Sequence, residues 1–146
     1  MPSRYQQRAV VLLVEDNPDD VVMIREALEQ SLTPIQLYVV SNGEQAMKFV
    51  RRTDADAPRP SLILLDLNLP IRDGLEVLAE LKGDHQFLSI PIVVLTQSRD
   101  PQDIERCYSL HANAYIIKPP DFDGYASLIH QLATCFLGLI SLPPVP

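Results

Sequence analysis

SLILLDLNLPIRDG, residues 61–74, contains the clearest structural signal in the chain. Its apolar run LILL, residues 62–65, ends at a single carboxylate, Asp66, and Pro70 and Gly74 mark a turn beyond it. A short apolar run bounded by turn residues is typical of a parallel strand buried on both faces. Open α/β sheets bind ligands at the carboxyl ends of such strands. Asp66 is therefore the candidate reacting group, and the alternative is a solvated turn aspartate.

Four further apolar runs have the same character and predict strands: AVVLLV at 9–14, IQLYVV at 35–40, IPIVVL at 90–95 and AYII at 114–117. Between and after the strands, apolar residues recur with helical spacing. The predicted helices run from Asn17 to about Ser31, from Gly43 to Val50, from Gly74 to Gly83, around residues 104–111, and from Tyr125 to Phe136. Strands that alternate five times with helices predict a parallel sheet covered by helices on both faces.

Length and composition predict one globular domain, residues 1–146, with 47% hydrophobic and 21% charged residues. A net charge of -7 disfavours direct binding of nucleic acid, because an acidic surface repels phosphate groups. The start of the chain, MPSRYQQRAV, has no apolar core of signal-peptide length, and no run approaches the about 20 apolar residues of a membrane span. We therefore expect a cytoplasmic protein without a membrane partner. Cys107 and Cys135 lack metal-ligand spacing and are predicted to be buried free thiols.

Polar residues stand at the ends of four predicted strands: Glu15 and Asp16, Asp66, Thr96, and Lys118. Parallel strands end at one edge, so these side chains should converge. Three converging carboxylates repel one another unless a cation lies among them, and an oxygen-only set suits Mg²⁺. A lysine and a hydroxyl group can bind the oxygens of a phosphoryl group. The set therefore predicts phosphoryl transfer onto the carboxylate itself.

These residues resemble the receiver domains of response regulators in two-component signalling. The acid pair Glu15–Asp16, the motif DLNLP with its Asp66, Thr96 and the Lys118–Pro119 pair stand in the order of that family. The resemblance covers about residues 10–136. It implies a flavodoxin-like α/β fold, (βα)5, with five parallel strands in the order 2-1-3-4-5.

The resemblance also implies roles for individual residues. Asp66 would be the phosphoacceptor, and a histidine kinase or relay protein would supply the phosphoryl group from a phosphohistidine. Asp16, Asp66 and the backbone carbonyl of Asn68 would bind Mg²⁺, and Glu15 would act through a water molecule. The protein would assist its own phosphorylation and dephosphorylation without being an enzyme that acts on other substrates.

Three further expectations follow from the same resemblance. Thr96 and Lys118 would bind the phosphoryl oxygens, and the Lys118–Pro119 peptide bond would be cis. Tyr115 matches the aromatic residue that moves with Thr96 when the site is phosphorylated; the alternative is a tyrosine that only packs in the core. Two departures from the family stand out, Gln97 where a small residue is usual and Pro120 as a second proline.

Four motifs resemble the stand-alone regulators of cyanobacterial phytochrome kinases: VEDNPDD (14–20), SNGEQAMKFV (41–50), IPIVVLTQS (90–98) and SLHANAYIIKP (109–119). This likeness implies a sensor histidine kinase, a phytochrome, as the partner. The core would span about residues 9–137. The apolar tail, residues 138–146, is predicted to form a homodimer contact together with the last helix. Alternatively, the tail folds back on its own domain.

Two other functions are possible on the same kind of sheet. An aspartyl-phosphate hydrolase needs a second acid two residues after its nucleophile to protonate the leaving group, and that position is Asn68 here. A pseudo-receiver that acts only as a scaffold is disfavoured by the complete set of five site residues.

Overall fold

The computed structural model describes residues 9–31, 34–52 and 56–136. Its strands form one parallel sheet in the order β2-β1-β3-β4-β5, which confirms the predicted flavodoxin-like α/β fold. Strands and helices alternate along the chain: β1 (Ala9–Val14), α1 (Pro18–Glu29), β2 (Ile35–Val40), α2 (Gly43–Val50), β3 (Leu62–Leu65), α3 (Gly74–Lys82), β4 (Ile92–Thr96), α4 (Pro101–Ser109), β5 (Ala114–Ile117) and α5 (Phe122–Thr134).

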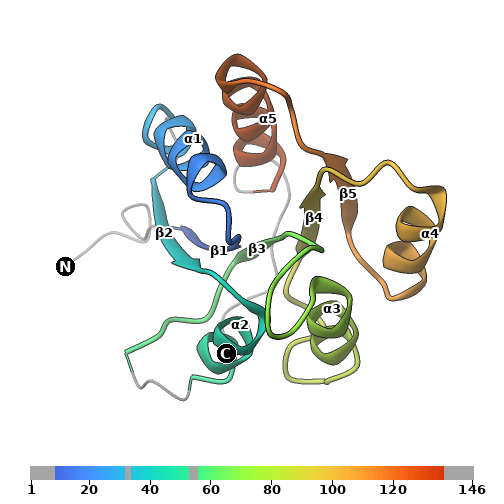
Figure 1. Cartoon of the computed structure of the whole chain (residues 1–146). Coiled ribbons are helices and arrows are strands. Elements are labelled where there is room, and N and C mark those ends of the chain that lie inside the picture. The colour runs from blue at the N-terminus through green and yellow to red at the C-terminus, as the bar shows by residue number, and fades with distance from the viewer. Residues whose placement is uncertain (1–8, 32–33, 53–55, 137–146) are drawn as a thin grey trace.

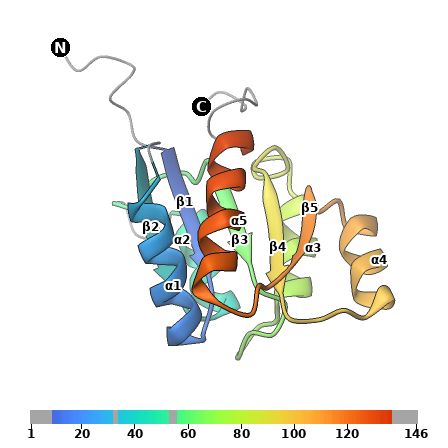
Figure 2. The same cartoon turned by 90° about the horizontal axis from the view of Figure 1, so that it is seen from above.

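Helices cover both faces of the sheet (Figure 1). α1 and α5 lie side by side on one face, while α2, α3 and α4 belong to the other (Figures 1 and 2). Successive strand residues point to opposite faces. In β3, for example, Leu64 belongs to the same buried cluster as Ile24 of α1 and Ile129 of α5, whereas Ile63 belongs to the cluster that contains Leu78 of α3. The central strands are therefore buried on both sides.

Each helix of the described residues begins at an Asn or Asp N-cap: Asn17, Asn42, Asp73, Asp100 and Asp121. Each of these side chains accepts a hydrogen bond from a backbone N–H in the first turn, which the helix itself leaves unpaired. The N-caps follow the carboxyl ends of the strands. They therefore order the loops that surround the predicted site.

Several predicted boundaries shift by a few residues. The fourth strand begins at Ile92, not at Ile90, because Ile90 closes a turn and its carbonyl accepts a hydrogen bond from the Lys82 ammonium (2.9 Å). The fourth helix, predicted around residues 104–111, begins earlier, at Pro101, because a proline fits the first helical position.

The Lys118–Pro119 bond was predicted to be cis, and this was wrong, since every peptide bond among the described residues is trans. The backbone N–H of Lys118 donates to the carbonyl of Thr96 (2.8 Å), so β5 stays paired with β4 up to the lysine. Strand pairing therefore directs the lysine to the sheet edge without a cis turn.

Cys107 is buried as predicted, but Cys135 is exposed. Tyr125, Ile129 and Leu132 form the buried stripe of α5, and Cys135 lies off that stripe at the C-cap. Within the described residues, no helix has the length and apolar character that crossing a membrane requires.

Gly74 should be intolerant of a side chain. A Cβ atom there would lie 2.2 Å from the backbone oxygen of Asp66 and 2.7 Å from the Cα of Leu67. We expect Gly74→Ala to lower the free energy of unfolding by about 1–3 kcal/mol through overpacking, measured by urea denaturation. Gly83→Ala is the control, because its Cβ would come no closer than 3.0 Å to any of its neighbours, the carbonyl oxygens of Ala79 and Glu80, and should cost much less. Equal effects of the two variants would contradict the prediction.

Candidate functional site

The sheet brings the predicted residues together at its carboxyl edge. Glu15 and Asp16 follow β1, and Asp66 follows the neighbouring β3. The backbone N–H of Asp66 donates to the carbonyl of Val14 (3.1 Å), so strand pairing continues into the site. Lys118 follows β5. The geometry of the edge is therefore set by the sheet and not by side chains alone.

Three carboxylates form the centre of the site. Oxygens of Glu15, Asp16 and Asp66 all lie within 4.8 Å of one another, and Glu15 and Asp66 are buried while Asp16 is exposed. The backbone N–H of Asn68 donates to Oδ1 of Asp66 (3.3 Å), which keeps this backbone segment beside the cluster. Oxygen-only ligands with one solvent-facing member suit a hard divalent cation that keeps several waters.

The electrostatics of Glu15 support this assignment. Burial, and then the hydrogen bond and charge of Asp66, raise the pKa of Glu15 from 4.5 to about 8, although Lys118 opposes the shift. Without a metal ion, Glu15 therefore keeps its proton at neutral pH, and the cluster carries one negative charge fewer. A divalent ion would stabilise the ionised form of all three carboxylates, so the residues fit the metal that the sequence predicted.

Lys118 supplies the positive charge of the site. Its buried ammonium contacts Glu15 and lies 3.2 Å from Oδ2 of Asp66. A third carboxylate, Asp20 of α1, is closer than Asp66, with its Oδ2 2.8 Å from the same nitrogen. Burial alone would lower the pKa of Lys118, but hydrogen bonds with Asp20 and Glu15 raise it above its ordinary value.

Sequence reasoning missed Asp20, an acid in the first turn of α1, as a member of the site. In the structure it is buried, and its Oδ1 accepts a hydrogen bond from the Tyr125 hydroxyl of α5 (3.1 Å). One signal could have identified it. Asp20 stands four residues before Ile24 and eight before Leu28, so it occupies the buried stripe of α1 where an apolar residue is expected.

Thr96 and Tyr115 meet at Ser98, in the loop after β4. Thr96 is fully buried, and its Oγ1 accepts a hydrogen bond from the backbone N–H of Ser98 (3.4 Å). The Tyr115 hydroxyl donates to the carbonyl of Ser98 (2.8 Å), and its partly buried ring packs against the core on the side of α2, α3 and α4. The two predicted switch residues therefore share a loop residue.

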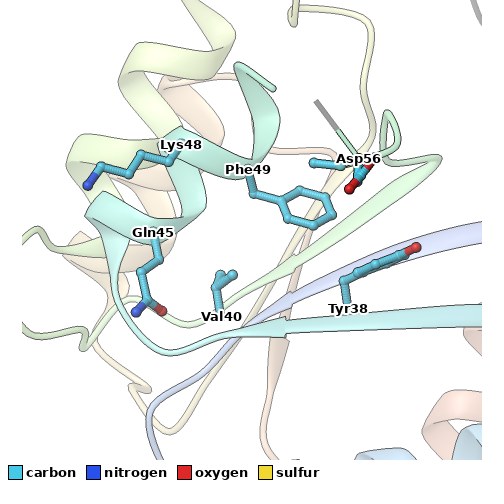
Figure 3. A pocket seen from close by; sticks show the side chains of 7 residues that line it. Tyr38, Val40, Gln45, Lys48, Phe49 and Asp56 are labelled. Atoms are coloured by element: carbon cyan, nitrogen blue, oxygen red, sulfur yellow. The ribbon is translucent and has the colours of Figure 1, made fainter. Parts of the chain in front are cut away.

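A pocket of about 270 Å³ opens over this edge, lined by Asp16, Asn17, Asp66, Asn68, Gln97 and Lys118. Gln97, one of the departures from the family pattern, thus stands at the entrance to Asp66. A larger pocket of about 450 Å³ lies between α2 and β2, where the rings of Tyr38 and Phe49 pack with centroids 5.1 Å apart (Figure 3). Its lining is mostly apolar and includes none of the residues of the carboxyl edge.

The fold and this edge define a receiver domain. The family model described as the response regulator receiver domain matches residues 11–130, and the chain belongs to this family. Response regulator Rcp1 of a Synechocystis strain is 38% identical over 136 residues, which cover 92% of each chain. The probable methanogenesis regulatory protein FilR2 of Methanothrix harundinacea is 35% identical over 88% of this chain and 84% of its own.

Two solved structures are similar over nearly the whole chain. The phosphorylated cyanobacterial phytochrome response regulator RcpA has a TM-score of 0.90 and 41% identity, covering 94% of this chain and 100% of its own. The Mn²⁺-bound form of Rcp1 has a TM-score of 0.88 and 38% identity, covering 93% and 99%. A metal ion is therefore bound by a relative of the same fold.

The raised pKa of Glu15 predicts a pH-dependent stability. In metal-free protein the folded state keeps the Glu15 proton up to about pH 8, whereas the unfolded chain releases it near pH 4.5. The contribution of Glu15 to stability is thus complete below pH 4.5 and is lost as the pH rises to about 8. Glu15→Gln, which resembles the protonated form, should remove this dependence. The measurement is urea denaturation of both proteins in chelator between pH 5 and 9. The prediction would be contradicted if the difference in free energy of unfolding between the wild type and Glu15→Gln did not change with pH.

Proposed function

We propose that this chain is a stand-alone response regulator that accepts a phosphoryl group on Asp66 from a sensor histidine kinase. The observation that supports this most is the position of the buried Asp66 carboxylate, which lies beside the two acids that follow β1 and 3.2 Å from the Lys118 ammonium. The relatives Rcp1 and RcpA, both response regulators of similar length, support the same function.

The metal site of the proposal uses residues of this edge. Asp16, Asp66 and the backbone carbonyl of Asn68 would hold Mg²⁺, with Glu15 acting through a water molecule. When bound, the ion supplies positive charge beside the phosphoryl oxygens and the three carboxylates. The Mn²⁺-bound form of Rcp1 supports a divalent cation at such a site. Deprotonation of Glu15 would accompany binding, because its proton and the metal are in competition.

The transfer itself is a nucleophilic displacement on phosphorus. A carboxylate oxygen of Asp66 forms the new P–O bond, the P–N bond of the phosphohistidine breaks, and its electron pair returns to the imidazole. Lys118 and the Thr96 hydroxyl would bind the oxygens of the transferred group. Hydrolysis of the acyl phosphate regenerates the carboxylate and releases inorganic phosphate.

Thr96 and Tyr115 would act as the switch. A phosphoryl group that binds the Thr96 hydroxyl competes with the long hydrogen bond from Ser98 (3.4 Å). Because Ser98 also accepts the bond from the Tyr115 hydroxyl, a shift of this loop would be transmitted to the tyrosine. The change is a local electrostatic event that biases a two-state element.

A phytochrome is the proposed kinase. RcpA is described as a phytochrome response regulator, and a further similar structure, with a TM-score of 0.86 and 31% identity, is the regulator RPA3017 in red light signalling of R. palustris. The cytoplasm is the proposed location, since that is where a histidine kinase would meet this domain. A net charge of -7 supports a protein partner and no direct contact with nucleic acid.

A homodimer is the proposed assembly, through α5 and the apolar tail. The tail, residues 138–146, lies outside the described residues, so this part of the proposal is supported by sequence alone. Residues 138–146, GLISLPPVP, carry no charged side chain. An apolar segment of this kind is typical of a contact surface.

Labelling of Asp66 tests the proposed function. With Mg²⁺ and acetyl phosphate, the wild type should gain the mass of one phosphoryl group, and hydroxylamine should remove it because an acyl phosphate is labile. Asp66→Asn should gain none, since an amide oxygen is a poor nucleophile at phosphorus. Asp73→Asn is the matched control, an exposed acid of the same loop that should label normally. The measurement is intact-protein mass spectrometry.

Equal labelling of Asp66→Asn and the wild type would refute the acceptor assignment. Rapid turnover of many phosphate esters would favour a hydrolase, and a wild type that does not label would favour a scaffold. Replacing acetyl phosphate by autophosphorylated kinases tests the partner: transfer from a phytochrome kinase should be faster than from kinases of other sensor classes.

Removal of the tail tests the dimer. A chain that ends at Phe136 should sediment as a monomer at concentrations where the full chain sediments as a dimer, because the truncation removes apolar contact area. Sedimentation equilibrium of both chains measures this directly. If both chains have the same state of association, the tail has no part in assembly.

A further inference from the structure

The ammonium of Lys118 is shared between two groups of carboxylates. Glu15 and Asp66 contact it at the sheet edge, and Asp20 contacts it from α1. An ammonium has three N–H donors, and these three carboxylates provide a partner for each. All four side chains are buried, so solvent does not weaken the competition for this cation.

Asp20 is held firmly on its own side. Its Oδ2 contacts Lys118 at 2.8 Å, and its Oδ1 accepts the hydrogen bond from Tyr125, which is 1% exposed. The start of α5 is packed tightly as well, because a Cβ on Gly124 would lie 2.5 Å from the side chain of Pro119, directly after the lysine. α1 and α5 together therefore fix the carboxylate that opposes Asp66.

We propose that Asp20 is a positioning residue that holds the Lys118 ammonium in the unphosphorylated site and competes with the phosphoryl group for it. The inference rests on the proposed function, because it assumes a phosphoryl group on Asp66. Asp20 thereby weakens the binding of that group. The ion pair of Asp20 with Lys118 also couples the charge at Asp66 to the packing of α1 on α5.

The charges of the site explain why Asp20 weakens the binding of a phosphoryl group. Asp20 is nearer to the lysine nitrogen than Asp66 is, at 2.8 against 3.2 Å. An incoming phosphoryl group adds negative charge on the Asp66 side and draws the ammonium toward it. Removing the charge of Asp20 removes both its pull on Lys118 and its repulsion of the phosphoryl group.

Tyr125 strengthens the binding of a phosphoryl group, whereas Asp20 weakens it. Its hydroxyl stabilises the Asp20 carboxylate when the lysine moves away, since a buried anion that loses one partner depends on those that remain. Without this hydroxyl, Asp20 would bind Lys118 more strongly. The proposal therefore requires that two variants of one hydrogen-bonded pair change phosphoryl binding in opposite directions.

The test uses BeF₃⁻, which binds an aspartate carboxylate in the shape of a phosphoryl group, with Mg²⁺ and the full chain. Asp20→Asn should lower the dissociation constant of BeF₃⁻ about three- to tenfold, since one opposing charge is removed. Asp19→Asn is the matched control for charge, because the neighbouring Asp19 is exposed, and it should change the constant less than about twofold. Tyr125→Phe should raise the constant. Isothermal titration calorimetry measures all four proteins, and the melting temperature of each is recorded.

The double variant Asp20→Asn with Tyr125→Phe should bind BeF₃⁻ as Asp20→Asn does, because the hydroxyl acts only through the carboxylate. A purely structural role would lower the melting temperature and weaken binding in every variant, and that result overturns the proposal. Unchanged or weaker binding by Asp20→Asn overturns it too, and so does tighter binding by Tyr125→Phe. If the wild type itself fails to bind BeF₃⁻, the proposed function falls and this inference falls with it.

Discussion

An excess of buried negative charge around one ammonium group governs this molecule. Glu15, Asp20 and Asp66 surround Lys118, and Asp16 completes the acidic cluster at the surface. Buried charges are stable only when they are paired. Here one cation serves several anions. Burial, and then the hydrogen bond and charge of Asp66, raise the pKa of Glu15, so it retains its proton to a higher pH than usual. The site is arranged to gain positive charge, which is the property that a metal-dependent phosphoryl acceptor needs.

The parallel sheet makes this arrangement possible. Glu15, Asp66 and Lys118 are far apart in the chain, yet each directly follows a strand, and the strands end at one edge. Strand pairing continues into the site through the N–H groups of Asp66 and Lys118. Acids that repel one another are thus held close by backbone hydrogen bonds and by a core on both faces of the sheet, and not by their own interactions.

Much of this could be predicted from the sequence because buried strands are uninterrupted apolar runs. The runs at residues 9–14, 35–40 and 114–117 correspond to strands with the same bounds. Where prediction failed, a tertiary contact decided the outcome. Ile90 is apolar, but its carbonyl accepts a hydrogen bond from Lys82. Asp20 has the sequence context of an ordinary acid at a helix start, and only its contacts with Tyr125 of α5 and with Lys118 after β5 reveal its place in the site. Local patterns do not contain such contacts.

Two tyrosines connect the acidic edge to different parts of the fold. Tyr125 reaches it through Asp20 and Lys118, on the face of α1 and α5, whereas Tyr115 reaches it through Ser98, on the face of α4. The first link consists of charges, so it responds to the charge at Asp66. The second consists of a hydroxyl and a carbonyl on a loop, so it responds to the position of the β4–α4 segment. On the proposed function, one phosphoryl group would therefore act on both faces of the sheet by different forces.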